Sequence, residues 1–505
     1  GCRRCCEIAK GIGMEQLRLQ VKGSYLFLPI WMEGKQSHLS LHLANGMATS
    51  FLLNVSQEAP STHVPVPIRG KYLLAEGDER ILSLLYFANN PRYAPSGLAF
   101  HYAPCFGWIN DPNGLVKTGG TYHLYYQYNP VGRKWGNMSW GHATSNDLIT
   151  WTQQDAVLFP DDENHVIFSG SGIEEEGMLY FPYTLANLDN PSLFSQHLAI
   201  SEDGGMHLRE LGTIIPTIEP GNRDPKVFHY KGNRYLVLWM RNHEFALFQG
   251  DDWFHWNLCN RFDAPPFWEC PDIYFLGDKV FFTAADGQYK EADFDGQRLL
   301  PKKENHFLFL TSLPYATQSY SGTGGETIII PWLRTKNINR PTRGVMGLPR
   351  VLGLAEKNGT SFIRKDPPSG FYDHFTQGGL LQGTLLETEL EGGACRLTLT
   401  VKKRITGKIG NLAFTYDPSN GIFHHEEDLP ESSIEETSSN AEDIVFESKP
   451  LILEFLIDGF IAEISDSEHL ELAHVEIDET KTQKCRISIT SKEDMRLTVQ
   501  LFRRE

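Results

Sequence analysis

Apolar and polar residues alternate in short runs along most of this chain, which is the pattern of β-strands with one buried face. Near the C-terminus, apolar residues recur at every second position in Arg396–Val401 and in Met495–Phe502. Glycine, proline, asparagine and aspartate separate such runs at short intervals. The pattern predicts an all-β protein.

Residues 1–95 contain the first group of short predicted strands. Turn residues punctuate them closely, which is typical of a small β-sandwich-like module. No motif in this group carries recognisable chemistry, so an accessory or packing role is favoured over glycan binding. The predicted strands are Gln16–Val21, Ser24–Ile30, His38–Leu43, Thr49–Asn54, Lys71–Leu74 and Ile81–Ala88.

Residues 96–355 contain a repeat, in which a glycine-bearing turn is followed by an aromatic or β-branched run. The five turn glycines are Gly120, Gly177, Gly232, Gly277 and Gly325, spaced by 57, 55, 45 and 48 residues. This spacing is close to the period of a four-stranded propeller blade. Five copies therefore predict a five-bladed β-propeller.

Residues 369–505 return to alternating strands and predict a C-terminal β-sandwich. The segment Lys365–Gly370 has the prolines and glycine of a connection, and we place the linker at 356–368. An acidic, serine-rich tract, Glu426–Glu442, is expected to form a solvated loop.

The size and charge of the chain limit its partners. At 505 residues, two or three domains are expected. The net charge of -17 argues against a nucleic acid partner, because phosphate binding needs a basic surface. No apolar run is long enough to span a membrane. A neutral small molecule or oligosaccharide is the expected partner, and the oligomeric state stays open.

The N-terminus is basic, but no apolar segment of a secretory signal follows it, so a cytoplasmic location is favoured. Because the first residue is Gly1, removal of a leader and secretion stay open. Eight scattered cysteines indicate reduced, buried thiols rather than a disulfide framework. Cys2, Cys5 and Cys6 have a spacing that could hold zinc, but no second ligand pair lies nearby. We predict no metal and no cofactor.

In each repeat, the segment before the turn glycine is expected to be the innermost strand, which lines the central channel. Three of these segments carry acids, at Asp111, Asp224 and Glu269. Acids at equivalent repeat positions converge on one axis although they lie far apart in sequence. Converging carboxylates suit glycoside hydrolysis, which needs one as nucleophile or base and one as proton donor.

Each acid also has an ordinary structural interpretation. Asp111 lies in Trp108–Gly114, where the turn dipeptides Asp-Pro and Asn-Gly would make it a turn carboxylate at a tight strand entry. Asp224, which precedes a proline, could cap a turn, and Glu269 could be a solvated residue at a strand end. The tryptophan and cysteine that flank Glu269 give it apolar company, which would suit a general acid.

These residues resemble the fructan-acting glycoside hydrolases of family 32, which include the invertases, inulinases and levanases. The resemblance runs in order from about residue 98 to the C-terminus. Trp108–Gly114 resembles the family's WMNDPNG box, with Ile109 in the methionine position. The further boxes are Tyr126–Pro130 (QYNP), Trp140–Ala143 (WGHA), Phe168–Ser171 (FSGS), Arg223–Pro225 (RDP), Trp268–Asp272 (WECPD) and Gly347–Arg350 at the end of the catalytic domain.

The resemblance extends to the C-terminal part. Leu453–Asp458 with Glu463 is similar to a strand motif of the family's β-sandwich, from which Phe460 and Ile464 depart. The family match implies a five-bladed β-propeller followed by a β-sandwich, in agreement with the repeat. Residues 1–95 lie outside it.

The resemblance also implies roles for individual residues. Asp111 corresponds to the nucleophile, Glu269 to the general acid/base and Asp224 to the transition-state stabiliser. The positions that bind or orient the terminal fructose correspond to Asn110, Gln127, Trp135, Phe168, Ser169 and Arg223.

The expected function is that of a retaining β-fructosidase. It would hydrolyse terminal β-D-fructosyl linkages of sucrose or of the fructans inulin and levan, through a covalent fructosyl-enzyme. The same acids would also serve a fructosyltransferase or an endo-acting fructanase. A non-catalytic carbohydrate-binding protein is less expected, because all three acids are present.

Overall fold

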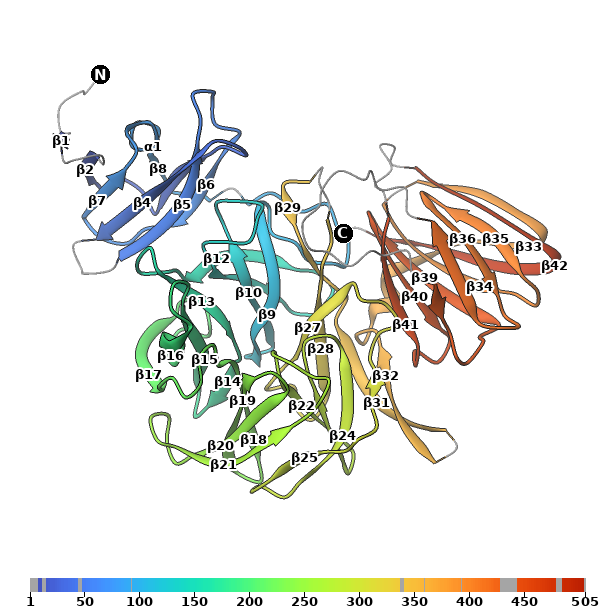
Figure 1. Ribbon diagram of the computed structural model, residues 1–505. Coiled ribbons are helices and arrows are strands. Elements are labelled where there is room, and N and C mark those ends of the chain that lie inside the picture. Colours follow the sequence, from blue (N-terminus) through green and yellow to red (C-terminus); the bar gives the residue numbers. More distant parts are fainter. Residues whose placement is uncertain are drawn as a thin grey trace.

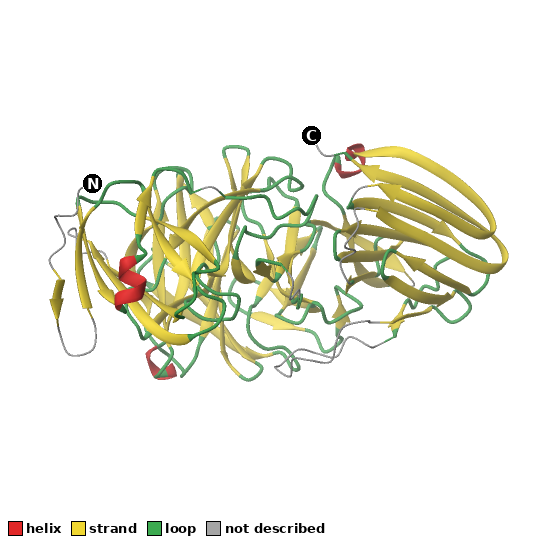
Figure 2. Cartoon of the chain, turned by 90° about the horizontal axis from the view of Figure 1, so that it is seen from above, coloured by secondary structure: helices red, strands yellow, loops and turns green. Residues whose placement is uncertain are grey.

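Strands form most of the chain in the computed structural model, and the helical elements are short. The structure describes residues 8–10, 15–43, 48–91, 93–336, 340–357, 359–391, 393–426, 443–477 and 484–503. Figure 1 shows an N-terminal module, a central ring of sheets and a C-terminal sandwich. Seen from above, the two flanking parts lie at opposite ends of the molecule (Figure 2). The predicted all-β class is confirmed, and no helix of the described residues could span a membrane.

The N-terminal module consists of two antiparallel sheets around a core that includes Leu26, Leu39 and Phe51. One sheet has the order β1-β2-β7-β4-β5 and the other β6-β3-β8. This arrangement agrees with the predicted sandwich-like module. The strands are β1 (Ile8–Lys10), β2 (Glu15–Gln20), β3 (Tyr25–Ile30), β4 (Lys35–Leu43), β5 (Ala48–Val55), β6 (Thr62–Pro67), β7 (Tyr72–Gly77) and β8 (Tyr86–Ala88).

The prediction of a strand over Ile81–Ala88 was wrong in its first half. This segment begins within the helix α1 (Glu79–Ser83), and only β8 is a strand. The side chain of Asp78 accepts a hydrogen bond from the backbone N–H of Arg80 at 2.9 Å, which caps the helix. A single helical turn thus buries the apolar residues that the alternating pattern had assigned to a strand.

The central domain contains five sheets whose main strands are antiparallel, as the repeat predicted. Four of the turn glycines lie in the hairpin between the first two strands of their sheet, and Gly177 lies between the short strand β14 and β15 (Figure 1). The main strands are β9 (Gly107–Thr118), β10 (Thr121–Asn129), β11 (Ser139–Ser145), β12 (Thr152–Leu158), β13 (His165–Gly170), β15 (Met178–Asn187), β16 (Ser195–Ser201), β17 (Arg209–Ile215), β18 (Arg223–Tyr230), β19 (Asn233–Arg241), β20 (Glu244–Gly250), β21 (Trp256–Asp263), β22 (Asp272–Leu276), β23 (Lys279–Thr283), β24 (Gln288–Phe294), β25 (Leu299–Pro301), β27 (Pro314–Ser319), β28 (Thr327–Leu333), β31 (Arg350–Lys357) and β32 (Thr360–Asp366). Shorter elements are β14 (Ile173–Glu175), the 3₁₀ turn η1 (Pro191–Leu193), β26 (His306–Phe307), β29 (Thr342–Arg343) and β30 (Val345–Met346).

The last sheet returns to the first and closes the ring. After β28, the short strand β29 pairs in parallel with β9 of the first sheet. β32 pairs with β31 as the outer strand of the fifth sheet, and it lies inside the linker predicted at 356–368. The connecting segment is therefore shorter than predicted, because the apolar and polar alternation continues to Asp366. The domain limits 1–95, 96–355 and 369–505 stay a prediction.

The C-terminal part is a two-layered sandwich built on two long strands. Residues 487–491 of β42 pair with β35 in one layer, and residues 495–501 of the same strand pair mainly with β34 and β33. The core between the layers includes Leu397, Phe455 and Ile489. The elements are η2 (Phe371–His374), β33 (Phe375–Glu391), β34 (Ala394–Thr400), β35 (Ile405–Ile409), β36 (Leu412–Asp417), β37 (Ile422–Glu426), β38 (Ile444–Val445), β39 (Ile452–Asp458), β40 (Ile461–Asp466), β41 (Leu472–Glu476) and β42 (Lys484–Phe502). The interior of the acidic tract and the three N-terminal cysteines lie outside the described residues.

The sandwich docks on the propeller through two buried acids from the family-like strand motif. Asp458 accepts hydrogen bonds from the backbone N–H groups of Ala99, Phe100 and His101 at 2.8–3.0 Å. Glu463 contacts the guanidinium of Arg350 and the ring of His101. Burial opposes protonation of His101, but hydrogen bonds to both acids outweigh this effect and raise its pKa to about 9. The motif is therefore a charged clasp between two domains.

We expect Asp458→Ala to destabilise the protein by about 3 kcal/mol or more, because it leaves three backbone donors and a histidine buried without their acceptor. Thermal unfolding followed by circular dichroism and calorimetry measures the loss. The matched control is Asp293→Ala on β24, where the side chain is 77% exposed. Equal melting temperatures for the two variants would contradict the clasp.

Candidate active site

A small pocket of about 20 Å³ lies where the inner strands of all five sheets approach the axis. Its residues come from the inner strands β9, β13, β18 and β27 and from the turn before β22. The acids Asp111 and Asp224 both line it. Its other lining residues are Pro112, Ser169, Gly170, Pro225, Lys226, Cys270, Pro271, Ala316, Thr317 and Gln318.

A repeated bulge directs the inner strands into this pocket. In the first sheet, Asn110 and Asp111 lie together opposite the single residue Gln127, because Ile109 pairs with Tyr128 and Pro112 with Tyr126. The same two-to-one register shift occurs in the second, third and fifth sheets. Bulges bend a strand and redirect its side chains. The expected turn at Asp111 is thus a bulge within β9.

Asp111 is held by hydrogen bonds from two other sheets. Ser169 donates its hydroxyl to Asp111 Oδ2 at 2.7 Å, and Cys270 Sγ lies 3.8 Å from the same oxygen. Burial and the nearby charge of Glu269 raise the pKa of Asp111 to about 6. The carboxylate is therefore oriented, and its ionised form is energetically costly.

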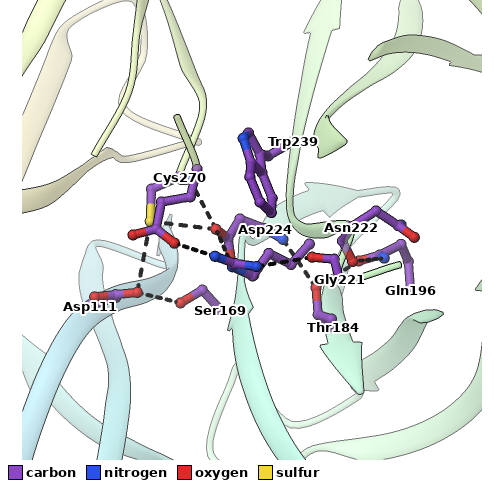
Figure 3. Close-up of polar contacts among 12 residues, drawn as sticks. Asp111, Ser169, Thr184, Gln196, Gly221, Asn222, Asp224, Trp239 and Cys270 are labelled. Atoms are coloured by element: carbon purple, nitrogen blue, oxygen red, sulfur yellow. Dashed lines mark hydrogen bonds and ion pairs between the residues drawn. The ribbon is translucent and has the colours of Figure 1, made fainter. Parts of the chain in front are cut away.

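Asp224 lies beside Asp111 on the next acid-bearing strand (Figure 3). Its Oδ2 accepts a hydrogen bond from the backbone N–H of Cys270 at 3.0 Å and lies 3.5 Å from Cys270 Sγ. Burial and the charges of Glu269 and Asp111 raise the pKa of Asp224, although Arg223 opposes the shift. Cys270 therefore connects both acids.

Glu269 lies in polar rather than apolar company, contrary to the expectation from its sequence neighbours. Arg223 Nη2 donates to Glu269 Oε2 at 2.6 Å, and the hydroxyl of Tyr315 donates to Oε1 at 2.6 Å. Arg223 also stacks on Trp239, with 4.2 Å between the guanidinium carbon and the ring centroid. Both oxygens of Glu269 are therefore fixed by side chains from other sheets.

The backbone at this site adopts a conformation that side chains rarely take. Asp224, Glu269 and Cys270 have positive φ values of 65°, 33° and 44°. Such residues carry strain that the surrounding structure must impose. At Gly114, which has a φ of 57°, an added Cβ would lie 2.7 Å from the ring of Tyr125, so glycine is required there.

The predicted sugar-binding residues occupy three kinds of position. Ser169 lines the pocket, and Arg223 is bonded to its acids. The rings of Trp135 and Phe168 meet edge to face at 6.1 Å, and Trp135 is 48% exposed. Asn110 and Gln127 are buried and bonded within the protein, to Trp108 Nε1 and to the carbonyl of Ile167 respectively. Their roles toward a sugar stay a prediction.

Sequence reasoning missed Cys270 and Tyr315 as parts of the site. Cys270 directly follows Glu269 in the predicted glutamate box, and no local pattern marks a thiol there as functional. Tyr315 precedes the fifth turn glycine and lies on the inner strand β27, so comparison of all five repeats would have found it.

The described residues contain one group with the spacing of metal ligands, Asp161, Asp162 and His165. The two aspartates are exposed, and none of the three lines the axial pocket. The pocket and the residues bonded around it offer carboxylates, a guanidinium, a phenol and a thiol.

Comparison with known proteins agrees with this architecture. A model of the glycosyl hydrolases family 32 N-terminal domain matches residues 101–366. The chain is 32% identical over 300 residues to sucrose-6-phosphate hydrolase of Escherichia coli, and the match covers 52% of this chain and 62% of that protein. The match thus spans less than two thirds of the relative.

Solved structures extend the likeness in fold. The exo-inulinase from Aspergillus awamori superposes with a TM-score of 0.71 at 22% identity, over 81% of this chain and 99% of its own. A family 32 glycoside hydrolase from Bifidobacterium adolescentis gives a TM-score of 0.69 at 18% identity and covers 96% of this chain and 99% of its own. Because the second match covers 96% of this chain, it includes most of the N-terminal module.

The fold and the site together define a five-bladed β-propeller with an acidic axial pocket, followed by a β-sandwich. Within this class, the chain belongs to the glycosyl hydrolases family 32.

We expect Asp111→Asn to stabilise the protein at pH 7.5, because the raised pKa of Asp111, about 6, makes its ionised form unfavourable in the folded state. In the unfolded chain this pKa is about 4. The stability that the protonated Asp111 gives the folded protein is therefore fully present below pH ~4 and is lost as pH rises through ~6. The gain should be on the order of 2 kcal/mol at pH 7.5, or about 2–4 °C in melting temperature, and should vanish near pH 4.

Thermal melts of the wild type and Asp111→Asn across this pH range measure the difference. Asp293→Asn, at an exposed position, is the control and should leave the melting temperature unchanged. A lower melting temperature for Asp111→Asn at pH 7.5 would show that the pocket favours the ionised acid.

Proposed function

We propose that this protein is a retaining β-fructosidase that hydrolyses terminal β-D-fructosyl linkages of sucrose or fructans. One observation carries the proposal: Asp111, Asp224 and Glu269 meet at the propeller axis through Cys270 and Arg223. Family membership and the similarity to a sucrose-6-phosphate hydrolase support it. The fold is also that of an exo-inulinase.

In the first step, Asp111 acts as the nucleophile. Its carboxylate oxygen forms a bond to the anomeric carbon of the fructosyl unit, while the bond from that carbon to the leaving-group oxygen breaks. Glu269 transfers its proton to the leaving oxygen. The Ser169 hydroxyl holds Asp111 Oδ2, which fixes the direction of attack.

In the second step, Glu269 removes a proton from water, and the water oxygen displaces Asp111 from the anomeric carbon. Arg223 and Tyr315 hold both carboxylate oxygens of Glu269, so the group keeps its position through both steps. This step releases free fructose and returns Asp111 to its ionised form and Glu269 to its protonated form.

Asp224 acts on the sugar rather than on the bond that breaks. Its Oδ2 is held by the backbone of Cys270, which leaves the carboxylate facing the axial pocket. Hydrogen bonds from sugar hydroxyls to this acid strengthen as positive charge develops in the oxocarbenium-like transition state. Asp224 would thereby stabilise that state.

We expect Asp111→Ala and Glu269→Ala to reduce hydrolysis of sucrose by several orders of magnitude while the protein stays folded, because these groups act as one unit. The measurement is the release of fructose from sucrose, inulin and levan over time, with circular dichroism as a check of folding. Free fructose alone favours an exo-acting hydrolase, whereas oligosaccharides favour transfer or endo attack. Near wild-type hydrolysis by either variant would refute the assignment.

A further inference from the structure

A groove of about 1020 Å³ lies between the N-terminal module and the propeller. One wall comes from β4 and β5 and the residues before β4, and the other from the propeller loops 131–137 and 160–166. Figure 1 shows the module beside β10, β12 and β13. This volume is at the upper end of the range for small-molecule sites, ~300–1000 Å³, and exceeds what one fructosyl unit requires.

The groove lies at the same mouth of the propeller as the acids. Asn129, at the end of β10, pairs with Trp108, so the loop that follows it emerges beside the start of β9. Arg343 also pairs with Trp108 and lines the groove. Because Trp108 donates to Asn110, the neighbour of Asp111, the groove and the axial pocket share one rim.

The exposed ring of Trp135 connects the two spaces. It lines the groove, and it contacts Phe168, which directly precedes the Ser169 that holds Asp111. A saccharide whose terminal fructosyl unit enters the axial pocket would therefore extend over Trp135 into the groove.

The N-terminal module fixes the loop that carries this tryptophan. The side chain of Asn137 accepts from the backbone N–H of Leu52 at 2.7 Å and donates to the carbonyl of Leu52 at 3.1 Å. Asn137 also donates to Asn129 Oδ1 at 3.3 Å, and Asn129 donates to the carbonyl of Lys134. The edge strand β5 thus holds loop 131–137 in place, as a neighbouring strand would.

The lining of the groove suits an uncharged, hydroxyl-rich chain. The charged side chains that line it have both signs. The cationic ones are Arg133, Lys134, Lys336 and Arg343, and the anionic ones are Glu33, Asp162 and Glu163. Such a mixture offers both donors and acceptors to the hydroxyls of a neutral saccharide. The Trp135 ring adds an aromatic face for the apolar side of a sugar.

We propose that the N-terminal module is part of the substrate-binding site and holds the sugar units of a neutral oligosaccharide beyond the fructosyl group that is cleaved. Met32 and Gln36, both exposed on the module wall, contact those units together with Trp135. This inference rests on the proposed function. It assigns the module a role in selecting long substrates over sucrose.

The test compares sucrose with an inulin-type oligosaccharide of about five units, using wild type and the double variant Met32→Ala/Gln36→Ala. We expect kcat/KM for the oligosaccharide to fall about tenfold, since two contacts worth about 0.5–1 kcal/mol each are lost. For sucrose, kcat/KM should change less than twofold. The matched control is Tyr72→Ala, because Tyr72 and Met32 are both 46% exposed and Tyr72 lies outside the groove.

Unchanged kcat/KM for the oligosaccharide, or an equal loss for both substrates, would overturn the proposed role of the groove in binding substrate. If the wild type hydrolyses neither sucrose nor the oligosaccharide, that result would instead contradict the proposed function. The groove is then tested by calorimetry, since the same oligosaccharide should bind about tenfold more weakly to the double variant than to Tyr72→Ala. Equal binding by these two variants would overturn the groove irrespective of activity.

Discussion

The site depends on one backbone constraint, which is the two-to-one bulge repeated in the inner strands. A regular strand would send successive side chains to opposite faces of its sheet. The bulge at Asn110–Asp111 breaks this alternation and turns Asp111 toward the axis, and an equivalent register shift does so at Asp224. Closure of the ring by β29 then fixes how closely the five inner strands approach. The convergence of Asp111 and Asp224 is therefore set by the backbone and does not depend on contacts between their side chains.

Bringing the acids together has a free-energy cost, which the structure offsets only in part. Burial and mutual repulsion raise the pKa values of Asp111 and Asp224. Arg223 supplies a compensating charge, and it is held against Trp239. Positive φ values at Asp224 and Cys270 add backbone strain. The packed cores between the sheets must supply the stability that the site lacks.

The fold was predictable because its signals repeat. Five turn glycines at near-constant spacing specify five hairpins, and the ordered boxes place Asp111 and Asp224 on inner strands and Glu269 just before one. Features that arise from register or from distant contacts were not predictable. The bulge at Asp111 has the local sequence of a turn, and the partners of Glu269 come from other sheets rather than from its sequence neighbours. The groove beside Trp135 requires two modules to be placed together, which no local pattern encodes.

The clasp at Asp458 has a consequence for the order in which the chain is made. Its acceptor lies 359 residues after Ala99, whose N–H it binds. While the ribosome synthesises the propeller, the backbone donors at residues 99–101 face water, and they find their acceptor only when β39 has emerged. Contacts between such distant residues form late, because a long loop must first close. The clasp between the propeller and the sandwich is thus formed last. A chain that ends after the propeller lacks the clasp, although its blades are complete.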